Sequence, residues 1–159
     1  MAVFPPPDEI SSLRRVLPDS APLTQVDKWH VTLVFLGEIP DERVEQVAEI
    51  LRTVPVPGRF ALRLGGSGQF GAVAWAAVDG DLEKLGQLRA AVKDALDARG
   101  FRSDERPFTP HLTVSYRGDE ATRRALTGYA GSSWTVSEFA LVRSHDGSYE
   151  QVYSWPTGA

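Results

Sequence analysis

Two of the three histidines in the chain open closely similar eight-residue segments. Residues 30–37 read His-Val-Thr-Leu-Val-Phe-Leu-Gly, and residues 111–118 read His-Leu-Thr-Val-Ser-Tyr-Arg-Gly. In both, Thr follows the His by two positions, an aliphatic residue follows the Thr, an aromatic residue stands five positions after the His, and Gly closes the segment. A pattern that occurs twice in one chain is a stronger signal than either copy alone.

The side chains in these segments are suited to acid–base chemistry on a phosphate. Two imidazoles opposed across a small gap can act together near neutral pH, because a neutral ring takes a proton from a nucleophile while a protonated ring gives one to the leaving oxygen. The hydroxyls of Thr32 and Thr113 can hydrogen-bond the non-bridging oxygens of a phosphate and hold it in line. We therefore predict phosphodiester opening with His30 and His111 as the catalytic pair, needing neither a metal nor a nucleophilic side chain.

Both segments are expected to be β-strands, because Val, Leu, Thr, Phe and Tyr dominate them. On a strand, residues i and i+2 share a face, so each His faces the same way as its Thr. The alternate residues, among them Phe35 and Tyr116, are expected to pack in the core. One strand from each half would then present an imidazole and a hydroxyl to a shared cleft.

Similar elements surround the two segments. Apolar residues at helical spacing predict helices that contain Ile10–Leu17, Val44–Leu51 and Leu85–Leu96, and a fourth helix is predicted over 119–127. Strands are predicted at 2–4, 60–64, 72–78, 135–143 and 149–155, with turns at 65–68 and 144–148. This order predicts an α+β fold with antiparallel sheets flanked by helices, in a single domain over 1–159 with pseudo-equivalent lobes at about 1–80 and 81–159.

Composition limits the classes of protein that the chain can belong to. Its 159 residues carry a net charge of −4, which argues against a protein that coats long nucleic acids but not against one that grips a single terminal phosphate. The absence of Cys excludes disulfides and thiolate chemistry. The apolar run 72–78 is too short to cross a bilayer, and the amino-terminal residues lack the pattern of a signal peptide, so we expect a cytoplasmic protein that does not bind membranes.

With their flanks, the two segments resemble the signature motifs of the two-histidine (2H) phosphoesterase superfamily. Trp29 precedes the first segment and Glu38 follows it, while Pro-Phe-Thr-Pro at 107–110 precedes the second. Within that superfamily the chain is most similar to the RNA 2′,3′-cyclic phosphodiesterases, also called 2′-5′ RNA ligase-like proteins. The resemblance covers nearly the whole chain.

This resemblance implies a bilobal, pseudo-symmetric fold with both motifs in a central cleft. It implies metal-independent and cofactor-independent hydrolysis of a 2′,3′-cyclic phosphate, at an RNA end or on a nucleotide, to a 2′-phosphomonoester. His30 would then donate a proton to the departing 3′-oxygen, His111 would activate water, and Thr32 and Thr113 would bind the phosphate. Some relatives also form a 2′-5′ bond in the reverse direction. We expect a monomer with no obligatory protein partner.

The second motif departs from the family pattern. Relatives often have Arg five residues after its His, where this chain has Tyr116. Arg117 lies on the same predicted strand face as His111 and Thr113, and we expect it to bind substrate in place of that Arg. Two alternatives stay open: a different cyclic phosphate, such as a small nucleotide or an ADP-ribose derivative, and a non-catalytic module that binds phosphorylated RNA ends.

Other side chains have weaker claims to a functional role. Basic side chains usually lie at the surface in contact with solvent. The basic residues that could instead line a cleft are Lys28, Arg102, Arg106, Arg117 and Arg143. Core packing is the default for aromatic residues, and the candidates to stack on a base are Trp29, Phe70, Tyr149 and Trp155. His145 has no counterpart in the other half and is expected in a solvated turn. No metal-binding spacing such as His-Glu-x-x-His occurs.

Overall fold

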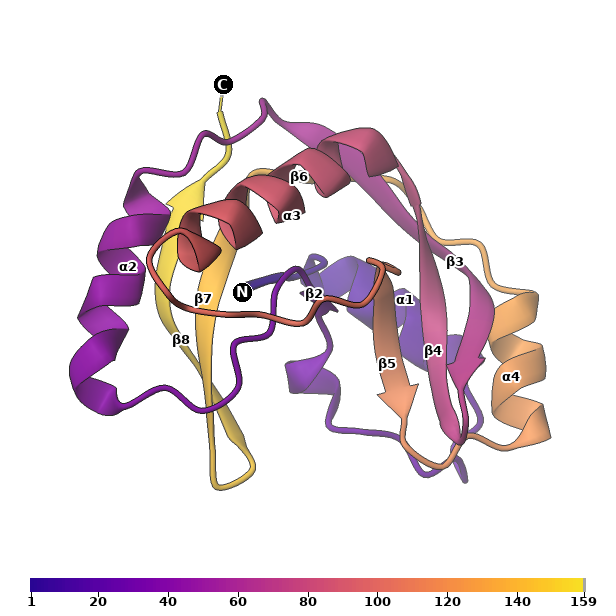
Figure 1. Ribbon diagram of the computed structural model, residues 1–159. Helices are drawn as coiled ribbons and strands as arrows, with labels where there is room; N and C mark the ends of the chain where they lie inside the picture. Colours follow the sequence, from indigo (N-terminus) through magenta and orange to yellow (C-terminus); the bar gives the residue numbers. More distant parts are fainter. Residues whose placement is uncertain (159) are drawn as a thin grey trace.

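A computed structural model describes residues 1–158 and forms two antiparallel sheets covered by helices (Figure 1). The helices are α1 (Pro7–Val16), α2 (Val44–Arg52), α3 (Leu82–Asp97) and α4 (Glu120–Thr127), with short 3-10 helices at η1 (Val26–Lys28) and η2 (Asp41–Arg43). One sheet has the order β2 (Val31–Thr32), β1 (Ala2–Val3), β7 (Glu138–His145), β8 (Ser148–Pro156). The other has the order β5 (His111–Ser115), β4 (Val73–Gly80), β3 (Phe60–Phe70), β6 (Trp134–Val136). The predicted α+β fold with antiparallel sheets is confirmed.

Each sheet takes strands from both halves of the chain. β5 and β6 complete the sheet that β3 and β4 begin, while β7 and β8 join the sheet of β1 and β2. Buried residues from both halves form one continuous hydrophobic core. The predicted boundary near residue 80 therefore does not separate the two sheets, because strand pairing across it is what builds each of them.

The two histidine segments occupy equivalent places in the two sheets. β2 is the edge strand of one sheet and β5 is the edge strand of the other. Val3 on β1 pairs with Val31 on β2, and Ala77 on β4 pairs with His111 on β5. An edge strand has a sheet neighbour on one side only, so the other side of each segment faces loops and the other sheet rather than a further strand of its own sheet.

Helix α3 follows from its apolar stripe. Leu85, Leu88, Val92 and Leu96 recur at helical spacing, and all four are fully buried. The helix ends before Gly100, which has a φ of +83°, a backbone conformation that glycine adopts without strain. In Figure 1 it runs across the upper half of the molecule, from beside α2 toward β3 and β4. The predicted helix is confirmed.

The turn predicted at Gly65–Gly68 is wrong. These residues lie inside β3, where the register against β4 shifts between Leu64 and Ser67. A glycine-rich bulge can absorb such a shift without ending the strand, and Gly66 has a φ of +88°. The chain reverses instead at Gly71, where φ is +58°.

The single strand predicted over 135–143 is also wrong. It divides around Ser137 into β6, which pairs with β3, and β7, which pairs with β1 and β8. A β-type sequence pattern cannot show that consecutive residues pass from one sheet to another. The turn predicted at 144–148 is confirmed, with Asp146 at φ 48° and Gly147 at φ 78°.

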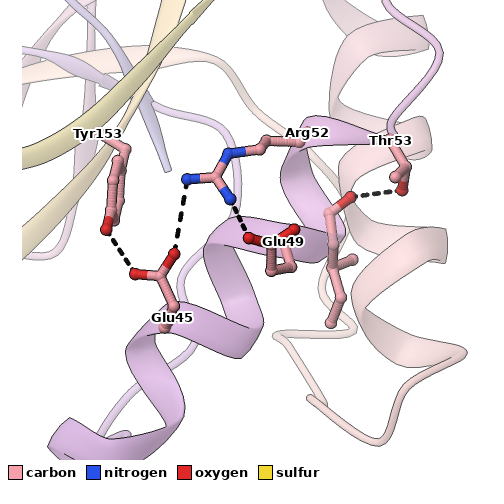
Figure 2. Close-up of polar contacts among 6 residues, drawn as sticks. Glu45, Glu49, Arg52, Thr53 and Tyr153 are labelled. Atoms are coloured by element: carbon pink, nitrogen blue, oxygen red, sulfur yellow. Dashed lines mark hydrogen bonds and ion pairs between the residues drawn. The ribbon is translucent and has the colours of Figure 1, made fainter.

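Polar contacts join α2 to the outer strand β8 (Figure 2). The Tyr153 hydroxyl donates to Glu45, and Arg52 pairs with both Glu45 and Glu49. At the end of the helix, the Thr53 hydroxyl donates to the carbonyl of Ile50 at 2.8 Å. Exposed ion pairs of this kind contribute little to stability, about 0–1 kcal/mol each, so α2 is held mainly by its apolar face.

Within residues 1–158, no helix combines the length and the apolar character needed to cross a bilayer.

The burial of the α3 stripe predicts a large stability difference between two leucines of one helix. Leu88→Ala removes a fully buried side chain and should lower the free energy of unfolding by about 2–5 kcal/mol. Leu82→Ala changes a side chain that is 41% exposed and should cost about 1 kcal/mol or less. Urea unfolding followed by circular dichroism measures both, and equal losses would contradict the assigned packing.

Candidate active site

A cavity of about 560 Å³ brings the two histidine motifs together. His30 and Thr32 line it from the β2 segment, and His111 and Thr113 line it from β5. The remaining lining residues are Thr24, Gln25, Lys28, Phe35, Tyr116 and Tyr149. The four side chains that the spacing placed on two strand faces therefore meet around one space, although the motifs belong to different sheets.

Both imidazoles are oriented by the same backbone contact. His30 Nδ1 donates to the carbonyl oxygen of Lys28 at 2.7 Å, and His111 Nδ1 donates to that of Thr109 at 2.6 Å. A carbonyl oxygen can only accept, so in each ring Nδ1 carries the proton. The neutral form of each ring consequently has Nε2 unprotonated and available for proton transfer.

Thr32 adds a contact at the reactive nitrogen of His30. Its hydroxyl donates to His30 Nε2 at 2.9 Å. A hydroxyl is both donor and acceptor and can rotate, so this proton can turn from the imidazole toward an anion in the cavity. His30 and Thr32 thus act on the same small volume, as their i, i+2 spacing predicts.

Aromatic rings flank each histidine. The His30 ring lies 5.7 Å from Phe4 and 5.5 Å from Tyr149, measured between centroids. The His111 ring is 5.1 Å from Phe70, edge to face, and 5.4 Å from Trp75. These rings limit the rotation of the imidazoles and exclude water from one side of each.

Burial makes the protonated form of His30 less favourable. It lowers the pKa of His30 below the ordinary value of 6.5, and the positive charge of His111 acts in the same direction. The hydrogen bond to the Lys28 carbonyl opposes this by favouring the charged ring. The net direction is downward, so the ring is mainly neutral at pH 7 when the cavity is empty.

The segment before the first motif is attached directly to the strand of the second. The backbone N–H and the hydroxyl of Thr24 donate to the Val114 carbonyl at 2.8 and 3.2 Å, and the Ser115 hydroxyl donates to the Pro22 carbonyl at 2.7 Å. Trp29 Nε1 donates to the Thr24 hydroxyl at 2.8 Å. These contacts fix the two motifs relative to each other across the boundary between the sheets.

Two residues expected in the core are exposed instead. Phe35 is 70% exposed and Tyr116 is 64% exposed, and both line the cavity. The strand alternation that predicted their burial ends too early, because β2 stops at Thr32 and β5 stops at Ser115. Nothing local in the sequence marks these strand ends, since both segments continue with β-forming residues.

Arg117 does not take the position expected for it. It is exposed and is not among the residues that line the cavity. Its backbone N–H donates to the Ser115 hydroxyl at 3.1 Å, and the strand has ended before it. The i, i+2 rule holds only within a strand, so the inference from His111 and Thr113 to Arg117 is wrong. Lys28 is the basic residue that lines the cavity.

The other candidate side chains divide between the site and the rest of the molecule. Tyr149 lines the cavity and Phe70 contacts His111, whereas Trp29 is 2% exposed and Trp155 packs on Phe139 at 5.4 Å between centroids. Outside the cavity lie the basic residues Arg102, Arg106 and Arg143, the last two of which contact Asp104 and Asp41. His145 is exposed at the β7–β8 turn, as predicted.

The donor set does not suit a metal ion. Across residues 1–158, no group of three or more His, Asp or Glu side chains is arranged to hold one.

Thr24 and Gln25 line the cavity without having been singled out from the sequence. No motif marks them, because they are placed there by the turn that leads into η1.

Comparisons with known proteins agree on the family. The model of the 2′-5′ RNA ligase superfamily matches residues 4–148. Curated relatives named RNA 2′,3′-cyclic phosphodiesterase include a protein of Geobacillus stearothermophilus, 30% identical over 144 residues, and one of Thermus thermophilus, 35% identical over 125 residues. These alignments cover 82% and 72% of this chain but 46% and 63% of the relatives. The Escherichia coli relative is 30% identical over 129 residues, which are 80% of this chain and 72% of that protein.

Solved structures have the same fold. The crystal structure of Escherichia coli LigT complexed with 3′-AMP matches with a TM-score of 0.78 and 23% identity, covering 98% of this chain and 95% of that one. The structure of TT0787 from Thermus thermophilus matches with a TM-score of 0.74 and 27% identity, covering 98% and 95%. With two His-x-Thr motifs around one cavity, a shared fold and a family match over nearly all of its length, the chain belongs to the 2′-5′ RNA ligase superfamily.

Proposed function

We propose that this protein hydrolyses 2′,3′-cyclic phosphates, at RNA ends or on nucleotides, to 2′-phosphomonoesters. The observation that carries this proposal is the pair of imidazoles that line one cavity, each with Nδ1 bonded to a backbone carbonyl. That arrangement leaves Nε2 of each neutral ring unprotonated and able to exchange protons, with the Thr32 hydroxyl bonded to that of His30 in the empty site. The names of the relatives support the same activity, although the chain spans about half to two thirds of the length of the first two.

The reaction needs two proton transfers around one phosphorus atom. His111 Nε2 accepts a proton from water as the water oxygen forms a bond to phosphorus. The bond from phosphorus to the 3′-oxygen breaks, and protonated His30 gives its Nε2 proton to that oxygen. The product is a 2′-phosphomonoester with a free 3′-hydroxyl, and proton exchange with solvent returns both rings to their starting forms.

The threonines bind the phosphate during these steps. Thr32 and Thr113 line the cavity beside the two rings, and their hydroxyls donate to the non-bridging oxygens. When Thr32 turns its proton toward the phosphate, His30 Nε2 loses its partner in the empty site. Nε2 is then free to carry the proton that the leaving oxygen needs.

The lowered pKa of His30 fits a proton donor only when an anion is bound. In the empty cavity, burial favours the neutral ring. A phosphate anion placed next to the ring favours its charged form and raises the pKa again. Substrate binding would thus load His30 with the proton that it later donates.

The lining of the cavity suits a nucleotide. Phe35, Tyr116 and Tyr149 are exposed aromatic residues on its wall, and base–aromatic stacking contributes about 1–3 kcal/mol per base.

The same cavity would accept the reverse reaction, in which an RNA 5′-hydroxyl takes the place of water and a 2′-5′ bond forms. Because one chain supplies both histidine motifs to the cavity, a monomer is sufficient for the proposed reaction. Action on RNA in the cytoplasm, without an obligatory protein partner, is part of the same proposal.

Turnover tests this activity directly. His30→Ala and His111→Ala should each slow hydrolysis of a 2′,3′-cyclic nucleotide by about 100-fold or more, because each removes a proton-transfer group. His145→Ala changes an exposed histidine outside the site and should leave the rate unchanged. ³¹P NMR should show a 2′-phosphate product, with activity that survives excess EDTA. Tight binding without any product would support a binding module instead, and loss restored by zinc or manganese would contradict the metal-free reaction.

The protonation of His30 gives a second test. In the free protein its imidazole should titrate below 6.5, and inorganic phosphate should move that value upward. NMR of the ring nitrogens measures both quantities and also reports that the neutral ring carries its proton on Nδ1. The rate should fall at both ends of the pH range, because one ring must be neutral while the other is charged. A His30 titration at or above 6.5 without phosphate would contradict the effect of burial.

A further inference from the structure

The smaller cavity is lined by basic side chains, although the protein as a whole is acidic. The chain has 21 Asp and Glu residues against 17 Lys and Arg, yet no carboxylate is among the residues that line the cavity in the part of the chain that the structure describes. Its ionisable side chains are Lys28, His30, His111, Tyr116 and Tyr149. The larger cavity of about 890 Å³ on the other side of Phe35 differs, since Glu38 and Asp41 line it. An anion therefore meets no carboxylate on the wall of the smaller cavity.

We propose that Lys28 is the cation that binds the phosphate of the substrate. The proposal rests on the proposed function, since it assigns a further residue to the same site. Within residues 1–158, Lys28 is the one Lys or Arg side chain on the cavity wall, while Arg117 lies outside it. An ammonium group is positively charged near neutral pH, whereas His30 is held mainly neutral when the cavity is empty.

Three contacts hold Lys28 at this position. Its carbonyl oxygen accepts from His30 Nδ1 at 2.7 Å, its Nζ donates to the Gly147 carbonyl at the β7–β8 turn, and the Nζ lies 5.3 Å from the centroid of the Tyr149 ring. Tyr149 in turn packs on His30 at 5.5 Å between centroids. The ammonium group is thus attached to the end of the β7–β8 hairpin and lies near the Tyr149 ring, which packs on His30. In Figure 1 the end of this hairpin projects below the rest of its sheet.

The ammonium keeps donors for a ligand. It has three N–H groups, and within residues 1–158 it makes one hydrogen bond, to Gly147. The others can reach a non-bridging phosphate oxygen while the first remains in place. A charge-assisted bond of this kind strengthens as negative charge builds on the phosphoryl oxygens during attack by water.

Lys28 could bind the phosphate, or it could only attach the hairpin, and variants of Lys28 should behave differently in the two cases. Lys28→Gln keeps a side-chain N–H donor that can bond Gly147 but removes the charge, and Lys28→Arg keeps the charge. If Lys28 binds the phosphate, the Gln variant should lose about 10- to 100-fold in kcat/KM for a 2′,3′-cyclic nucleotide, the range of one charge-assisted hydrogen bond. The Arg variant should retain most of the activity. Lys84→Met, at an exposed position on α3, is the matched control and should equal the wild type.

A second variant moves the charge to the opposite wall. Tyr116 lines the cavity from the end of β5 and is 64% exposed, so an arginine side chain there can reach the same phosphate. Lys28→Met should lose activity, and Lys28→Met combined with Tyr116→Arg should regain at least about 10-fold of it. Hairpin attachment alone does not account for such a rescue, because residue 116 follows β5, which belongs to the other sheet from the β7–β8 hairpin.

Binding of inorganic phosphate separates this proposal from the proposed activity. Chemical-shift titration of the His30 and His111 rings should show phosphate affinity weakened about 10-fold or more in Lys28→Gln and unchanged in Lys84→Met. Phosphate affinity and kcat/KM that are both unaffected in Lys28→Gln would overturn the role of Lys28, even if the wild type hydrolyses cyclic nucleotides. Lys28-dependent phosphate binding in a wild type without turnover would instead uphold Lys28 and overturn the proposed hydrolysis.

Discussion

The site depends on one repeated hydrogen bond, from an imidazole Nδ1 to the carbonyl oxygen two residues earlier. Because the acceptor belongs to the backbone, the bond needs no particular side chain at Lys28 or Thr109. It nevertheless decides the tautomer of each ring and directs the opposite nitrogen toward the cavity. In each motif the accepting carbonyl lies just before the strand, and the histidine stands at or next to the start of that strand. The position of each histidine relative to its strand therefore sets the orientation of its ring.

The arrangement of the sheets explains how two distant motifs reach one cavity. Both motif strands lie at sheet edges, and each sheet is completed by strands from the other half of the chain. Thr24 donates to β5, and Ser115 on β5 donates to Pro22, so these hydrogen bonds join the segment before the first motif to the strand of the second. Opening the cavity would require breaking buried backbone pairing, which is costly. The two histidines are therefore held at a constant separation by the fold rather than by any contact between them.

The charged side chains on the cavity wall are basic, whereas the net charge of the whole molecule is negative. Excess negative charge keeps a protein soluble but repels an anionic substrate, and here the carboxylates lie outside the cavity wall. Burial lowers the pKa of His30 at the same site, so the empty cavity avoids holding two charged imidazoles beside Lys28. A bound phosphate changes this balance, since it compensates for the positive charge that the protein alone disfavours.

Residue types and spacing were enough to predict much of this protein. The duplicated His-x-Thr pattern predicted that the side chains of His30, Thr32, His111 and Thr113 would share a cleft. It could do so because an i, i+2 spacing on a strand is a local property that needs no knowledge of the fold. The helices followed in the same way from apolar periodicity, which burial of one face requires.

What the tertiary structure decided was everything that depends on where strands end and which strands pair. Phe35 and Tyr116 continue a β-type pattern, yet both lie beyond the last paired residue of their strands and reach the cavity instead of the core. Arg117 was misplaced for the same reason, and the residues around Ser137 pass between sheets with no local sign. Strand pairing is a contact between distant parts of the chain, so local sequence cannot specify its limits. From the sequence, Lys28 was one of five basic residues that could line a cleft. In the fold, η1 and the contact with the β7–β8 hairpin place it on the cavity wall.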